Sequence, residues 1–165
     1  MKRLSGFMIN NNILVVFTLD DHSYALPLFQ VRRIIRVAGW TPLPQAPEMV
    51  LGVINISGEV IPVFNMRKRF GIPDREIHLS DQLIVAQTSK RAVALLVDHV
   101  ENLIEEEKHQ RVEIQEVIPD LKYIEGIVKL DSGLILIHNL ESFLSVEEEK
   151  ALDQSLENVS REDNG

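Results

Sequence analysis

The 165-residue chain contains no cysteine. This absence excludes a disulfide framework and zinc sites built on thiolates, and it fits a reducing compartment such as the cytoplasm. Aromatic residues make up only 5% of the chain although 45% of it is hydrophobic. The core must therefore be built from Val, Ile and Leu, and the β-branched pair favours strands.

Long apolar runs and an excess of positive charge are also missing. No apolar stretch approaches the ~18 residues needed to span a bilayer, so we expect no direct membrane insertion. The basic start and the first apolar run lack a small-residue cleavage site, which favours a strand over a signal peptide. The net charge is −8. The charge pattern offers no basic face for phosphates, so we expect no nucleic-acid partner.

Short apolar runs punctuated by Gly, Pro, Asn, Asp and Ser predict a mainly β fold. The second half of the chain repeats the pattern of the first. So many short strands favour barrels over a parallel α/β sheet. The expected strands cover residues 13–19, 24–28, 31–37, 53–56, 59–64, 82–86, 92–97, 126–130 and 134–137, with 98–104 extended or briefly helical and 112–118 mixed.

Helices are expected to be few and short. A single turn is predicted at 47–51, and a short helix at 65–70 has Asn65 as N-cap and Gly71 as its stop. Another turn is expected at 140–144. Ser145 and Glu148 have the spacing of a capping box, which predicts a helix towards Asn158.

The chain therefore divides into three parts. Residues 1–11 are expected to form a loose lead-in, residues 12–145 one β domain of two subdomains, and residues 146–165 an acidic helix and tail. This last part carries seven acidic side chains against two basic ones.

One tripeptide raises the question of catalysis. Asp131, Ser132 and Gly133 follow an apolar strand, as the Asp-Ser/Thr-Gly of aspartic proteases does, and a dimer would supply the second carboxylate. A hairpin turn explains the same three residues, because each favours turns locally. The turn is the favoured interpretation, and a dimeric aspartic-type hydrolase using Asp131 is kept as an alternative.

Other chemical sites find no support in the sequence. The five His have no metal-ligand spacing, so no metal site is expected. Ser57 has no nucleophile elbow around it, and the Gly residues form no phosphate loop. A small-ligand barrel is a further alternative, although barrels of this size are normally filled by side chains.

Apolar residues on both faces of the first strands leave two interpretations open. One face of a small barrel fills its interior, so Val15, Leu28, Val31 and Ile34 could lie outside and form a binding patch. Alternatively, the second half of the chain could cover these four side chains. The residue pattern does not distinguish the two.

Several segments resemble the CheW-like family, the coupling proteins of bacterial chemosensory arrays. The most specific is the turn between two apolar strands in residues 52–67, which reads Gly-Val-Ile-Asn-Ile-Ser-Gly-Glu-Val-Ile-Pro-Val-Phe-Asn-Met-Arg. The resemblance covers about residues 12–145 in the family's order and spacing. The other segments are Tyr24–Pro27, Val31–Ile35, Thr41–Pro47, Leu96–Val100 and Gly126–Leu144.

The resemblance implies two intertwined five-stranded SH3-like barrels around a shared core, with no catalysis and no cofactor. It implies a cytoplasmic adaptor that couples the cytoplasmic tip of chemoreceptors to the regulatory domain of a CheA-type histidine kinase. The kinase-facing residues would be Val15, Leu28 and Val31. The receptor-facing residues would be Asn55, Ser57, Gly58, Val97 and Val100.

The sequence departs from the family pattern near the implied receptor groove. Ser57 stands where the family has Arg, and Arg33 stands where members often have an acidic residue that can pair with it. Asn65 replaces a common Asp. The usual charge-assisted bond cannot form between a neutral and a basic side chain. A diverged scaffold that has lost its receptor contact is therefore a third alternative.

Overall fold

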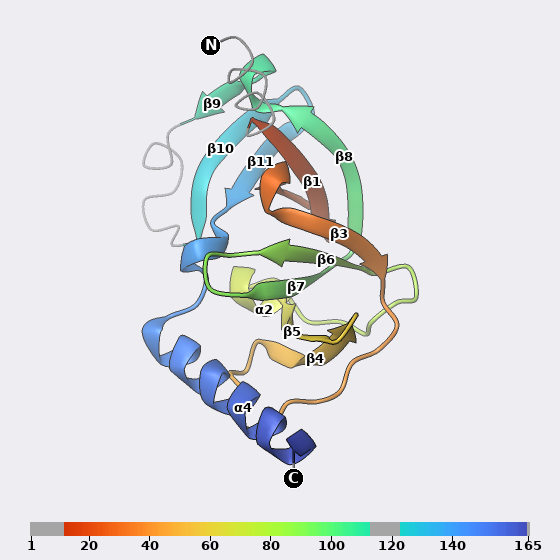
Figure 1. Ribbon diagram of the computed structural model, residues 1–165. Helices are drawn as coiled ribbons and strands as arrows, with labels where there is room; N and C mark the ends of the chain where they lie inside the picture. Colours follow the sequence, from red (N-terminus) through yellow and green to blue (C-terminus); the bar gives the residue numbers. More distant parts are fainter. Residues whose placement is uncertain (1–11, 113–122, 165) are drawn as a thin grey trace.

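The computed structural model describes residues 12–112 and 123–164 (Figure 1). Their main elements are eleven strands, which form two sheets, and a C-terminal helix. The strands are β1 Ile13–Leu19, β2 His22–Pro27, β3 Val31–Arg36, β4 Val50–Ile56, β5 Glu59–Asn65, β6 Gln82–Gln87, β7 Ala92–Val97, β8 His99–Glu105, β9 Gln110–Val112, β10 Ile124–Leu130 and β11 Gly133–His138. The helices are α2 Met66–Phe70 and α4 Val146–Asn164, with 3₁₀ turns η1 Leu28–Gln30, η2 Glu106–Lys108 and η3 Leu140–Ser142.

Sheet A has the order β8-β1-β2-β11-β10-β9, and sheet B has the order β3-β6-β7-β5-β4. In the sequence, the strands of sheet B lie between the first two and the last four strands of sheet A. Sheet B comes from one continuous segment, whereas sheet A combines the beginning and the end of the domain through the parallel β2–β11 pair. The two sheets therefore do not correspond to the first and second halves of the chain, between which the sequence predicted a repeat.

The mainly β prediction is confirmed, and the two expected five-stranded SH3-like barrels are found as two open sheets. Sheet A has six described strands and sheet B five, and neither ladder closes on itself within the described residues. Each sheet still encloses an apolar cluster of its own. Leu14, Val16 and Ile135 belong to that of sheet A, and Ile61 and Leu83 to that of sheet B.

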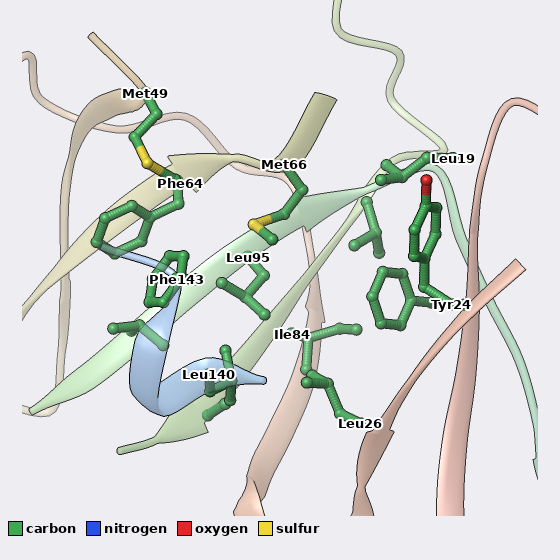
Figure 2. Close-up of a cluster of buried hydrophobic side chains, with 14 of the residues drawn as sticks. Leu19, Tyr24, Leu26, Met49, Phe64, Met66, Ile84, Leu95, Leu140 and Phe143 are labelled. Carbon is green, nitrogen blue, oxygen red and sulfur yellow. The ribbon is translucent and has the colours of Figure 1, made fainter. Parts of the chain in front are cut away.

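The largest core lies between the two sheets and is shared by both (Figure 2). Phe17 and Leu26 enter it from sheet A, and Phe64 and Leu95 enter it from sheet B. Phe143 crosses Phe64 edge-on, with ring centroids 5.0 Å apart. Successive side chains of a strand point to opposite faces of its sheet. One face therefore contributes to the cluster of that sheet, and the other face contributes to the shared core.

Most locally encoded elements appear where the residues predict them. The Asn65 side chain accepts a hydrogen bond from the Arg67 N–H at the start of α2, and Gly71 ends this helix at φ 69°. The predicted turn at 140–144 is η3, and the extended option for 98–104 is β8. Of 112–118 only Val112 is described, and the lead-in 1–11 lies outside the described residues.

Residues 47–51 do not form the predicted helical turn. The Val50 N–H donates to the Pro47 carbonyl at 2.9 Å, which closes a tight turn, and β4 begins at once. Because Val50 and Leu51 continue into an apolar strand, sheet pairing overrides the local helix start offered by Pro47.

Helix α4 begins with the predicted capping box. The Glu148 N–H donates to Ser145 Oγ at 3.1 Å, and the Ser145 N–H donates to Glu148 Oε1 at 2.9 Å. Leu152 is fully buried in the shared core. Glu148 also pairs with Arg69 at 2.5 Å, so the acidic C-terminal helix docks on the domain and runs to Asn164, beyond the predicted end.

Candidate partner-binding site

The β4–β5 hairpin ends in a polar turn at Ser57 and Gly58 that a side-chain hydrogen bond closes. Both residues have positive φ, 53° and 87°, as the two-residue turns preferred between twisted strands require. Asn55 Oδ1 accepts a hydrogen bond from the Gly58 N–H at 2.9 Å. All three residues are exposed, so the turn presents preformed polar groups to a partner.

Sheet B carries an ion pair next to the two positions that depart from the family pattern. Arg32 on β3 pairs with Glu59 on β5 at 3.1 Å, while no ion pair of Arg33 is found in the described part of the chain. The acidic residue therefore sits beside Ser57 and the basic residue beside Arg33. The family's usual pair would place the basic side chain at position 57 and the acidic one at position 33. Here the basic Arg32 and the acidic Glu59 join the same two segments from neighbouring positions, which were not predicted from the sequence.

Two residues expected at the receptor groove lie deeper than predicted. Val97 is 1% exposed and belongs to the shared core, so it lies beneath the surface and not on it. Its place at the end of a central strand, where alternate side chains face the shared core, explains the difference. Val100 is half-buried, and its N–H donates to Gln82 Oε1 at 2.7 Å.

The expected kinase-facing residues lie around η1 and β3. Leu28 and Val31 are half-buried, and Ile34 is exposed. Val15 is only 1% exposed, which corrects its expected place on the open patch. It pairs with Leu26 and Leu103 inside sheet A, and η1 packs against its strand.

Phe29 is the surface residue that the sequence analysis missed. Its side chain is 64% exposed on η1, between Leu28 and Val31. An exposed aromatic side chain beside half-buried aliphatic ones is typical of the centre of a protein interface. Its exposure could have been predicted from its place in the short connection between two strands, which has too few residues to cover the side chain.

A charged network joins the two sheets where the chain leaves sheet B. Arg67 of α2 bonds Asp20 of the β1–β2 turn and Asp98 before β8, each at 2.6 Å. Arg75 bonds Asp98 at 2.7 Å and the buried Asp81 at 2.8 Å. The network fixes how sheet A meets sheet B.

The network also shifts the ionisation of its members. The hydrogen bond from Arg67 lowers the pKa of Asp20. Burial opposes ionisation of Asp81, but hydrogen bonds from Arg75 and from the His78 N–H outweigh it and lower the pKa of Asp81. The hydrogen bond to Asp20 raises the pKa of Arg67. These charges are satisfied by one another, so the network is structural.

The described residues give no support to the hydrolase alternative. Asp131 lies exposed in the two-residue turn between β10 and β11, where Leu130 pairs with Gly133. Turn formation accounts for it fully. Within residues 12–112 and 123–164 no group of three or more His, Asp or Glu could hold a metal ion. None of the described helices is both long and apolar enough to cross a bilayer.

Fold and surface together define a β-sheet interaction module, with exposed apolar and polar contacts on a rigid two-sheet frame. The family model named CheW-like domain matches residues 14–148. The chain is 31% identical to the chemotaxis protein CheW of Rhizobium meliloti, over 84% of this chain and 90% of that protein. It is 30% identical to the chemotaxis protein CheW of Thermotoga maritima, over 87% and 94%.

A solved structure shares the fold. The scaffolding protein TtCheW from Thermoanaerobacter tengcongensis matches with a TM-score of 0.74 and 30% identity, over 84% of this chain and 95% of that one. The chain belongs to the CheW-like domain family. It is a non-catalytic chemotaxis adaptor.

Proposed function

We propose that this adaptor couples the cytoplasmic tip of chemoreceptors to the regulatory domain of a CheA-type histidine kinase. The observation that carries the proposal is the exposed Phe29, flanked by Leu28 and Val31, in a chain of this family. Apolar side chains ringed by polar ones suit a contact between proteins. The protein would act in the cytoplasm and reach the membrane only through its receptor partners.

Leu28, Phe29 and Val31 form the proposed kinase-facing surface. Phe29 would enter a pocket of the partner, because exposed aromatic side chains bury a large area at low entropic cost. Val15 would support this surface from beneath, since η1 packs on β1. Direct contact is thus assigned to the exposed Phe29 and the half-buried Leu28 and Val31.

Asn55, Ser57, Gly58 and Val100 form the proposed receptor-facing surface. The preformed turn offers polar groups without an ordering cost. Val97 would hold the adjoining strand end in place from within the core. The Arg32–Glu59 pair supports retention of the contact, because it joins the segments that carry the family's usual pair.

Calorimetric titration against the regulatory domain of the CheA-like kinase from the same genome tests the kinase contact. We expect saturable binding that Phe29→Glu weakens at least about tenfold, because it buries a charge at the interface centre. Val31→Glu should act in the same direction, but Val31 also packs against the shared core. Phe29 is exposed, so its variant separates binding from folding.

Leu134→Glu is the matched control, since Leu134 is an exposed apolar residue on β11. It should bind the kinase as the unchanged protein does. Equal binding by all variants would refute the assigned surface, and absence of binding to the kinase would refute the coupling function.

The receptor contact is tested with a soluble fragment of a chemoreceptor hairpin tip from the same genome. Binding that is lost when Gly58 is replaced by Val would support the turn as the contact. Failure of the unchanged protein to bind, with kinase binding intact, would instead support a diverged scaffold that has lost its receptor.

A further inference from the structure

Sheet B has an open seam between its two edge strands. Strands β3 and β4 are the edges of the ladder, and no strand pairing joins them in the described part of the chain. A single bridge covers part of the β4 edge: Thr41 and Val53 exchange backbone hydrogen bonds of 2.9 and 2.7 Å. The edge continues past this bridge towards the Ser57–Gly58 turn.

An open groove of about 500 Å³ lies along this seam. Its apolar lining includes Ile35, Trp40, Ile54 and Leu83, and its polar lining includes Arg36 and Asn55. Ile35, Trp40, Ile54 and Leu83 also belong to the apolar cluster enclosed by sheet B. The groove therefore leads from the surface to the side of that cluster.

The backbone of Asn55 faces out of the sheet beside the groove. Val53 directs its N–H and carbonyl to Thr41, away from β5, and it lies opposite Pro62, which has no N–H to offer. Residues two apart on a strand direct their backbone groups to the same side. The N–H and carbonyl of Asn55 therefore also point away from β5. Among the described residues no backbone hydrogen bond reaches this edge at Asn55.

The charge at the seam is opposite to that of the chain. The chain carries a net charge of −8, yet β3 has three exposed Arg. Arg32 pairs with Glu59, whereas Arg33 and Arg36 have no ion pair within residues 12–112 and 123–164. An occupant of the groove would therefore meet uncompensated positive charge, which favours carboxylates.

We propose that an extended, acidic segment of another protein adds to the β4 edge at Asn55. Its backbone pairs with Asn55, one apolar side chain enters the groove beside Trp40, and a neighbouring carboxylate pairs with Arg36. Strand addition draws affinity from main-chain hydrogen bonds and specificity from side-chain pockets. This surface goes beyond the coupling of receptor and kinase, and it shares Asn55 with the proposed receptor-facing surface, so the segment and the receptor would compete at that residue.

Trp40 is the only tryptophan of the chain, so its fluorescence reports directly on the groove. The probe is a capped seven-residue peptide of alternating Asp and Ile with Thr at both ends. Titration into the full-length protein should give a saturable change in Trp40 emission. Amide hydrogen exchange should slow at Asn55, and Arg36→Gln should weaken binding about tenfold.

Lys129→Gln is the matched control, because it removes one exposed charge from sheet A. It should leave peptide binding unchanged, and an N-methylated peptide that cannot pair along the edge should not bind. No saturable change, equal binding of a Lys-for-Asp peptide, or equal loss with Lys129→Gln would each overturn the proposal. A Trp40 change that depends on protein concentration alone would overturn it in favour of a second copy.

Discussion

His138 is a polar residue held in an apolar setting. It is fully buried, and its ring lies edge-on to Phe70 and Phe143 at 5.1 and 5.6 Å. Neither ring nitrogen has a hydrogen-bond partner among residues 12–112 and 123–164. Burial, with a smaller contribution from the nearby Arg69 charge, lowers the pKa of His138 to about 3. The imidazole is therefore neutral in the folded protein across the physiological range.

This burial makes folding sensitive to acid. Below the unfolded-state pKa of about 6.5 the unfolded chain binds a proton that the folded chain excludes, so stability falls as pH drops towards the folded pKa. The loss attributable to His138 reaches at most roughly 5 kcal/mol near pH 3. Urea unfolding of the unchanged protein and of His138→Leu should diverge below pH 6.5.

The comparison is needed because Asp20, Asp81 and Glu148 also have lowered pKa values and lose their stabilising charge in acid. Those carboxylates are shared by both proteins, so only the difference reports on His138. Parallel stability curves from pH 7 to pH 4 would contradict the assignment.

Gly52 lies so close to the backbone of Thr41 that any side chain at this position would clash with it. A Cβ there would lie 2.2 Å from the Thr41 carbonyl oxygen and 2.8 Å from Trp40 Cδ1. Gly52→Ala should therefore push away the Thr41 bridge and lower the free energy of unfolding by about 3 kcal/mol. Thermal unfolding measures the change.

Gly126→Ala is the matched control for this prediction. The atoms nearest to its Cβ would be those at the end of the Arg111 side chain, the first at 2.5 Å, and that side chain can move. The loss of stability should be clearly smaller than at Gly52. Equal losses at the two positions would argue against the bridge as the cause.

At the scale of elements, α4 shows how an acidic tail becomes part of the fold. The family match ends at residue 148, yet α4 continues to Asn164 and places Leu152 in the shared core. Arg91 of the β6–β7 connection bonds Glu149 at 3.0 Å and also bonds Asp153. The helix thus neutralises part of its own charge against the domain.

We predict that Leu152→Ala lowers the free energy of unfolding by about 3 kcal/mol, because it opens a cavity at a fully buried site. Val146→Ala on the same helix, at a residue 67% exposed, should change it by less than about 0.5 kcal/mol. Urea denaturation gives both values. Similar small effects would mean that the helix does not dock in solution.

The elements that the sequence predicts well are those encoded by neighbouring residues. The Asn65 cap, the Gly71 stop, the Ser145–Glu148 box and the two-residue hairpin turns depend on contacts within a few positions. The prediction of a helical turn at 47–51 was wrong, because pairing with β5, which is outside these residues, determines their conformation. Local chemistry is visible in a linear pattern, and competition from distant partners is not.

At the scale of the molecule, the Arg67 network determines how the two sheets are joined. Arg67 reaches Asp20 across 47 positions and Asp98 across 31, so no local pattern reveals it. The same limit explains why Val15 and Val97 were expected at the surface. Their burial depends on which strand lies beside them, and this follows from topology alone.

Arg67→Met should cost about 3 kcal/mol, because it removes a buried guanidinium that bonds the half-buried Asp98 and the exposed Asp20. Arg111→Met removes the more exposed pair with Glu106 and an exposed hydrogen bond to the Glu125 carbonyl, and it should cost less than about 1 kcal/mol. Calorimetric unfolding compares the two. If the Arg67 variant matched the Arg111 variant, the network would not hold the sheets together.

The insertion of sheet B within sheet A has a consequence for synthesis of the protein. Ser23 pairs with Ile135, 112 positions later, whereas every strand of sheet B is available once residue 97 has left the ribosome. The β1–β2 hairpin must therefore wait with its apolar face open until the last strands emerge. Biogenesis, and not the mature protein, is where this chain is most exposed to aggregation.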